Sequence, residues 1–379
     1  MRDRKGRTVL HYLVRSNDHE STKYIIQQLT ESERLLTLCM QDRLGKSVLH
    51  EAAYETHYEL LGSIITLLPE AQRLHAMTLQ DQSGTTVFHH VVRLGNVESI
   101  EHILILFPES QLLQAVCLQD REGVTVLHRA VEAGNHTIVK CVLTLLPQSQ
   151  RLRAVTMRDD NGSTLLHYIA IHRSVDRVAL VENSIALLPE SHRLQFVNMR
   201  TSVGETVLHC AASRGHSELI KHILRFLPES EHLNALSLQD CDGCTVFHRA
   251  AMSGNIDCID AVLAPCPEAE LSQIVCMRDN ANQTMLHCSA HSGKPQSIVH
   301  ILQLLPEAQR LQVVCARDEY GLTVFRIFCD DGWIGREETS KDILTLLPAS
   351  QRSQAIRMID EKVERVWGHR WHDESDDDL

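Results

Sequence analysis

The stretch Asp120-Arg121-Glu122-Gly123-Val124-Thr125-Val126-Leu127-His128-Arg129-Ala130 recurs, with substitutions, nine times along this 379-residue chain. Its glycine marks the phase of each copy, and the equivalent residues are Gly6, Gly45, Gly84, Gly123, Gly162, Gly204, Gly243, Asn282 and Gly321. Neighbouring copies are 39 residues apart, except that Gly204 follows Gly162 after 42 residues. A regular period of this size is typical of a solenoid, in which each repeat packs on its neighbours.

Each position of the stretch has a structural meaning. An aspartate such as Asp120 can accept backbone N–H bonds and close a turn, and only one copy lacks it, with Thr201 in its place. The glycine favours a left-handed backbone, which asparagine tolerates best among the other residues. Threonine or serine two residues later suits a helix N-cap. The histidine three residues further on, replaced by Arg326 in the last copy, is expected to bond back toward the cap region of its own or a neighbouring repeat.

The pattern D-x-x-G-x-T-x-L-H-x-A-A-x-x-G-N/H resembles the ankyrin repeat, and residues 240–255 carry nearly all of it. The resemblance extends over the chain to about residue 355. It implies a finger-like β-turn and two antiparallel helices per repeat, stacked into a curved array that binds proteins. Two features depart from the family. The proline that usually follows the threonine is Val, Leu or Met here, and the period of 39 exceeds the family's 33 by about six residues.

A second marker accounts for the extra residues. Eight of the ten prolines recur once per repeat from the second repeat onward, at Pro69, Pro108, Pro147, Pro189, Pro228, Pro267, Pro306 and Pro348. Proline disfavours helix in the residue before it and suits the first turn of a new helix. The sequence therefore predicts a short third helix in each repeat, and an all-α ankyrin-type solenoid of nine repeats. Similar proline-punctuated arrays occur in effector proteins of intracellular bacteria, which is a weaker resemblance.

The two ends of the array carry separate expectations. The chain begins within a repeat, because Met1-Arg2-Asp3 matches residues 157–159, so either the first repeat caps itself or residues upstream are missing. We favour the second alternative, since a solenoid end normally carries a polar cap. The array is predicted to span residues 1–355. A capping helix running toward Trp367 and Trp371 follows at 356–371, and an acidic tail at 372–379.

Composition limits the classes of function. The formal net charge of −12 argues against general nucleic-acid binding, which needs a basic surface. No signal peptide is visible, and no apolar run approaches the ~20 residues of a membrane span. The twelve cysteines follow the phase of the repeat, which indicates packing in a reducing compartment. We expect a cytoplasmic monomer without cofactors, or a protein of the host cytoplasm if the chain is a secreted effector.

No residue pattern indicates catalysis or a metal site. Cys241 and Cys244 form one C-x-x-C pair, but zinc needs four ligands and no second pair stands at suitable spacing. His50-Glu51 begins like a zinc-protease helix, yet Tyr54 occupies the place of the second histidine. The sequence therefore predicts no enzyme, no cofactor and no metal within this chain.

The remaining candidate is a surface. In an ankyrin-like stack the finger tips and the outer positions of the first helices line the concave face. The predicted partner-binding residues are Arg4, Lys5, Tyr12, Arg15, Arg43, Lys46, Tyr54, His90, Arg93, Arg121, Arg129 and Glu132. They form either a docking strip for an acidic protein or scattered solvated charge. The expected function is a protein-interaction scaffold or targeting module; the alternative is the recognition part of an enzyme whose catalytic domain lies outside residues 1–379.

Overall fold

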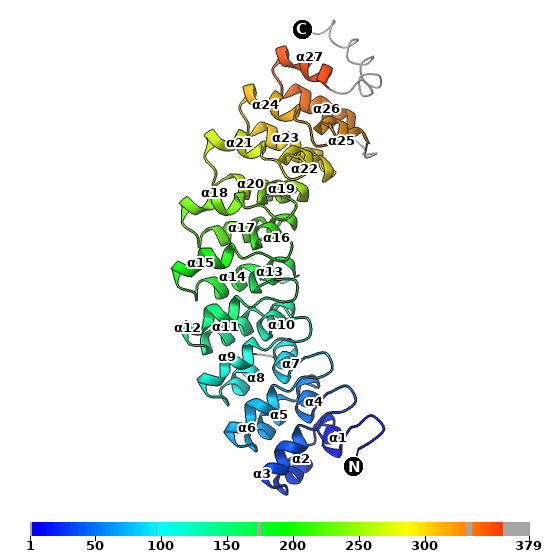
Figure 1. The fold of residues 1–379 in the computed structure, drawn as a ribbon, viewed down its shortest axis with the longest axis vertical. Coiled ribbons are helices and arrows are strands. Elements are labelled where there is room, and N and C mark those ends of the chain that lie inside the picture. Colours follow the sequence, from blue (N-terminus) through cyan, green and yellow to red (C-terminus); the bar gives the residue numbers. More distant parts are fainter. Residues whose placement is uncertain (1, 96, 173–175, 331–335, 359–379) are drawn as a thin grey trace. The chain divides into compact units, whose positions relative to one another are not determined.

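The computed structural model describes residues 2–95, 97–172, 176–330 and 336–358, and within them it is helical with two isolated β-bridges. Each repeat contributes three helices, so the predicted short third helix is confirmed (Figure 1). The predicted helix over 356–371 and the acidic tail fall almost wholly outside the described residues. The last described helix, α27, ends at Met358.

The helices fall into three classes by their place in the repeat. The first helices are α1 (Val9–Arg15), α4 (Val48–Tyr54), α7 (Val87–Leu94), α10 (Val126–Glu132), α13 (Leu165–Ile171), α16 (Val207–Ser213), α19 (Val246–Ser253), α22 (Met285–His291) and α25 (Val324–Asp330). The second helices are α2 (His19–Gln27), α5 (Tyr58–Thr66), α8 (Val97–Leu104), α11 (His136–Leu145), α14 (Arg177–Ile185), α17 (Ser217–Leu224), α20 (Ile256–Leu263), α23 (Pro295–Gln303) and α26 (Arg336–Thr345). The third helices are α3 (Glu31–Leu38), α6 (Glu70–Met77), α9 (Glu109–Cys117), α12 (Gln148–Val155), α15 (Glu190–Val197), α18 (Glu229–Ser237), α21 (Leu271–Val275, preceded by the 3-10 turn Glu268–Glu270), α24 (Glu307–Val314) and α27 (Ala349–Met358).

The chain divides into two compact blocks, Met1–Ser202 and Val203–Leu379. In the N-terminal block, first helices pack on first helices (α1, α4, α7, α10, α13) and second helices on second helices (α2, α5, α8, α11, α14). The C-terminal block repeats this order with α16, α19, α22 and α25. The apolar faces of these rows form the core, where residues such as Val48, Leu61 and Ile64 have no exposed surface.

The recurring stretch builds one finger and one capped helix per repeat. In the second repeat, the Asp42 carboxylate accepts the N–H groups of Leu44 and Lys46, at 2.8 and 2.9 Å, which closes the finger as predicted. The reference glycines and Asn282 all have positive φ, at 56–81°. A threonine or serine begins each of the first eight first helices, and the repeat histidine completes a capping box with it.

The repeat histidine also joins neighbouring repeats. The Nδ1 of His89 accepts the N–H of Thr86 at 3.2 Å, so the ring proton lies on Nε2. That Nε2 donates to the carbonyl of Val124 in the next repeat, at 3.0 Å. Burial of the ring lowers the pKa of His89 to about 4, so it stays neutral near pH 7. The expected bond toward the cap and the neighbouring repeat is therefore present.

An arginine of the third helix caps the second helix. The Nε of Arg73 donates to the carbonyl of Leu68 at 3.1 Å, and its Nη1 to that of Leu106 in the next repeat at 3.2 Å. Arg34 and Arg310 make the same pair of contacts. Arg151 likewise binds carbonyls at the end of α11. These arginines satisfy the orphan carbonyls of a helix end and are structural.

Candidate protein-binding surface

Successive fingers are joined edge to edge by their backbones. The N–H of Arg43 donates to the carbonyl of Lys5 at 2.8 Å, and the N–H of Gln82 to that of Leu44 at 2.9 Å. The N–H of Arg121 donates in the same way to Ser83 at 3.1 Å. Each finger tip is therefore held in register with the one before it. Side chains at the residue after the aspartate form a row along the tips.

That row is basic at its start. Arg4, Arg43 and Arg121 occupy the tip position in the first, second and fourth repeats, and Lys5 lies beside Arg4. All four side chains are exposed, and none has a hydrogen-bond or ion-pair partner among the described residues. We call these four residues the basic fingertip row. Asp160 takes the tip position in the fifth repeat and ends it.

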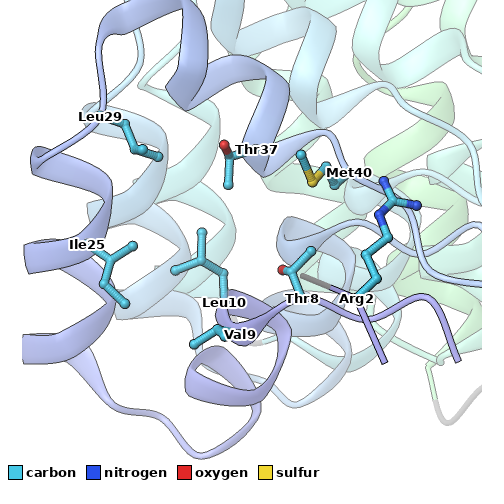
Figure 2. Close-up of a pocket in the computed structure, with 8 residues that line it drawn as sticks. All are labelled: Arg2, Thr8, Val9, Leu10, Ile25, Leu29, Thr37 and Met40. Atoms are coloured by element: carbon cyan, nitrogen blue, oxygen red, sulfur yellow. The ribbon is translucent and has the colours of Figure 1, made fainter. Parts of the chain in front are cut away.

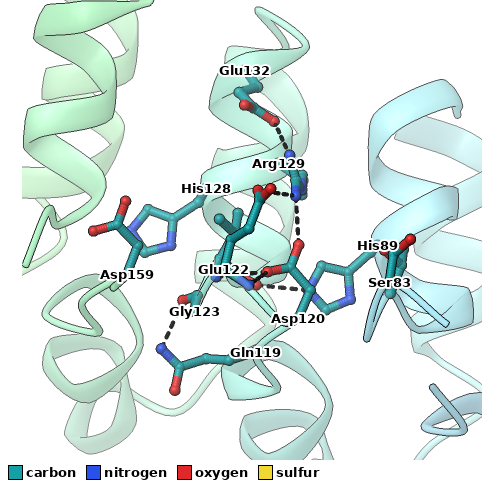
Figure 3. A network of polar contacts seen from close by, with 12 residues as sticks. Ser83, His89, Gln119, Asp120, Glu122, Gly123, His128, Arg129, Glu132 and Asp159 are labelled. Atoms are coloured by element: carbon teal, nitrogen blue, oxygen red, sulfur yellow. Dashed lines mark hydrogen bonds and ion pairs between the residues drawn. The ribbon is translucent and has the colours of Figure 1, made fainter. Parts of the chain in front are cut away.

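The carboxylates of the fingers do not neutralise this row. Asp120 is 8% exposed, and its Oδ1 accepts the N–H groups of Glu122 and Val124 within its own finger. Its other oxygen accepts from Arg129 at 2.5 Å (Figure 3). In the first finger, Asp3 is held by Arg7 and by the hydroxyl of Tyr12. The bond from Tyr12, aided by backbone N–H groups, lowers the pKa of Asp3.

Two tyrosines lie behind the tips with cations over their rings. The Lys46 ammonium is 3.9 Å from the centre of the Tyr54 ring, and the Arg7 guanidinium is 4.5 Å from that of Tyr12. Tyr12 is 46% exposed and Tyr54 44%, so each ring keeps an accessible face. Rings of this kind, amphipathic and with few rotamers, are common energetic centres of protein interfaces.

The structure corrects the placement of two predicted surface residues. His90 is only 6% exposed, with its ring edge-on to Tyr54 and His50, so it belongs to the packed wall behind the tips. Burial of the ring lowers its pKa to about 3. Arg129 is half-buried because it binds Asp120, Glu122 and Glu132. Burial opposes its charge, but the bonds to these carboxylates outweigh that effect and raise the pKa of the guanidinium.

The other predicted residues divide into paired and free groups. Arg15 is exposed but lies 3.5 Å from a carboxylate oxygen of Glu55, and Glu132 is held by Arg129. Arg93 is exposed near the end of α7. Leu44, which sequence reasoning missed, is 57% exposed beside Arg43 at the second tip. The signal was available, because Leu44 occupies the phase of Lys5 in the next repeat.

Comparison with known proteins agrees with this geometry. A family model for three copies of the ankyrin repeat matches residues 184–274. Those residues carry ankyrin repeats. A similar solved structure is the ankyrin repeat domain of Bcl-3, described as a unique member of the IkappaB protein family. It is 19% identical in sequence, and the match covers 68% of this chain and 99% of that one with a TM-score of 0.52, which supports the fold. No curated protein sequence matches the chain.

In the described residues, no group of three or more His, Cys, Asp or Glu side chains could hold a metal ion, and no helix is long and apolar enough to cross a membrane. Burial raises the pKa of Cys39 to about 11 and that of Cys258 to about 12, so these thiols stay protonated near pH 7.

A pocket of about 340 Å³ lies at the start of the array (Figure 2). It is lined by residues of α1, the end of α2 and α3, together with Arg2 and Met40. Val9 in its wall is 60% exposed, whereas the equivalent Val48 and Val87 are fully buried against the preceding repeat. The pocket is thus the stacking face of the first repeat, and its lining is that of the core rather than of a ligand site.

Proposed function

We propose that the chain is a protein-interaction module whose partner docks on the finger and first-helix surface of the N-terminal block. Ankyrin repeats, which the family model and the fold support, are protein-binding scaffolds. The observation that carries the choice of surface is the combination of unpaired cations at the tips with the exposed rings of Tyr12 and Tyr54. In the rest of the first-helix row, residues such as Leu49, Phe88 and Leu127 are committed to the core.

The test is a quantitative affinity capture of proteins from cell lysate with the full chain, comparing two alanine variants by mass spectrometry. Tyr54→Ala removes an exposed ring from the proposed surface. Tyr24→Ala removes a ring that is 65% exposed on α2, outside the row of first helices. We expect Tyr54→Ala to lower recovery of the specific partner roughly tenfold or more, as for an interface hot spot, and Tyr24→Ala to leave it unchanged. Loss with Tyr24→Ala alone would place the partner on another face.

Two finer proposals concern the cellular setting of the module and its oligomeric state. The proline-punctuated repeat supports a role as an effector of an intracellular bacterium, acting on proteins in the host cytoplasm. Such a role predicts that the partner is recovered from host lysate and not from the producing bacterium. We also propose that the module acts as a monomer, which light scattering coupled to size-exclusion chromatography would test.

A further inference from the structure

We propose that the basic fingertip row binds an extended acidic segment of the partner, an inference that rests on the function proposed above. The row consists of Arg4, Lys5, Arg43 and Arg121. It narrows the predicted binding residues to the finger-tip cations whose charge is free for a partner. It also specifies the chemistry of that partner as carboxylate side chains on an extended chain.

The first argument is that the structure separates free from committed cations. Arg7 is held by Asp3, Arg15 by Glu55, and Arg129 by three carboxylates. A partner would have to break these pairs to use the charges. The four residues of the basic fingertip row have no such partner among the residues that the structure describes. Their charges can therefore pair with incoming carboxylates without a competing internal bond.

The second argument is the rigid spacing of the row. Backbone bonds of 2.8–3.1 Å fix the second, third and fourth tips each to its predecessor. Packed helices lie about 8–10 Å apart, so the first and fourth tips are separated by roughly 24–30 Å. An extended chain covers about 3.3 Å per residue, and roughly 7–9 residues span the row. Gln82 occupies the third tip, so acidic residues about three positions apart would meet Arg4 and Arg43, and another about six positions further on would meet Arg121. Leu44 and the ring of Tyr54 offer apolar contact beside them.

The third argument is the contrast between this row and the rest of the chain. The protein carries a formal net charge of −12, which disfavours a polyanion that would contact a wide surface, such as a nucleic acid. The corresponding tip positions of the C-terminal block hold Cys241, Asn280 and Glu319 and contain no basic residue. The positive charge is therefore local, which suits a short acidic segment.

The experiment selects peptides from a displayed library of random 15-residue sequences on the immobilised full chain. We expect the enriched peptides to carry three or more Asp or Glu residues, with spacings near three and near six. Synthetic versions of these peptides, with a fluorescent label, are then titrated by anisotropy. Arg43→Glu with Arg121→Glu should weaken binding roughly tenfold or more, and Arg43→Gln with Arg121→Gln should weaken it less. Raised salt should weaken binding to the unaltered chain more than to either variant.

The matched control is Lys140→Glu with Arg153→Glu, which makes the same change in charge. Both residues are exposed on α11 and α12, away from the row of first helices. The control should change affinity by less than about twofold. Enriched peptides without an acidic bias, or equal losses in the two reversal pairs, would overturn the inference. So would tighter binding of a 15-nucleotide single-stranded DNA than of the acidic peptides.

The outcome is separable from that of the proposed function. Suppose that a lysate partner is lost with Tyr54→Ala but is bound at full affinity by the variant with Arg43 and Arg121 reversed. That result would support the proposed docking surface and refute the acidic segment. Circular dichroism and the thermal midpoint should match the unaltered chain for both reversal pairs, because the altered side chains are exposed. The glutamine pair supplies the comparison if the reversed pair is destabilised.

Discussion

At the scale of single residues, the glycine of the finger has two separate constraints. Gly123 and Gly134 share the same left-handed backbone, with φ of +73° and +72°. A Cβ on Gly123 would lie 2.7 Å from the backbone nitrogen of Asp160 in the next finger, whereas one on Gly134 would meet nothing within 4 Å. Gly134→Ala should cost ~1 kcal/mol of unfolding free energy, for backbone conformation alone. Gly123→Ala should cost roughly 1–3 kcal/mol more, because the finger must move.

Urea unfolding of the two variants measures both free energies. Equal losses would mean that backbone conformation decides the residue and that the fingers can separate freely. The contact also changes the expectation for asparagine. The sequence indicates that asparagine suits this phase, since Asn282 occupies it with φ of 56°. At Gly123 its Cβ would meet the same nitrogen, so Gly123→Asn should cost more than its backbone preference predicts.

At the scale of elements, the histidine caps make the first helices sensitive to acid. Burial lowers the pKa of His89, His128 and His209 to about 4. An unfolded histidine has a pKa of about 6.5. Below that pH the histidines of the unfolded chain bind protons, whereas the buried rings of the native state remain neutral. The histidines' contribution to the free energy of unfolding is therefore fully present above about pH 6.5 and decreases toward pH 4. Each ring should contribute ~1.4 kcal/mol of loss per pH unit inside this window.

Urea unfolding at pH 7.5, 6.5 and 5.5 would show this loss. His89→Gln supplies the control, because glutamine can serve in a capping box but does not titrate. The variant should be less stable at pH 7.5, since the bond to Val124 is altered, yet it should lose less stability on acidification. Parallel pH profiles for the two proteins would show that His89 is not responsible.

The element scale also shows what the sequence could and could not predict. The sequence predicted three helices per repeat from the repeat period, the turn aspartate, the N-cap threonine and the recurring proline. These features were informative because each acts through the local chemistry of the backbone. The side-chain bonds from the residue before each finger aspartate to the next repeat were missed. Gln41 donates to the carbonyl of Gln80 at 2.7 Å, and Arg278 to that of Arg317 at 2.7 Å. All nine copies carry glutamine or arginine at this phase, so a signal existed.

The candidate site was harder to predict than the fold. Sequence phase places Arg43 and Arg129 in the same strip, and His90 beside them. Only the neighbours in space show that Asp120 holds Arg129 and that packing buries His90. Charge pairing across a repeat depends on rotamers and burial, which a linear pattern does not contain.

At the scale of the whole molecule, the local stability of each repeat in a solenoid depends on its interfaces with the neighbouring repeats. Within the N-terminal block, α4 packs on both α1 and α7, whereas the opposite face of α1 leaves Val9 60% exposed. Hydrogen exchange should therefore be faster in α1, α2 and α3 than in α4, α5 and α6.

The matched substitutions that test this difference are Val9→Ser and Val48→Ser, at the same position of successive repeats. Val48→Ser should cost roughly 2–4 kcal/mol of unfolding free energy, from lost burial and a buried hydroxyl, and Val9→Ser only a few tenths. Equal protection of the two repeats, with equal cost of the two substitutions, would show that the stacking face of the first repeat is covered in solution.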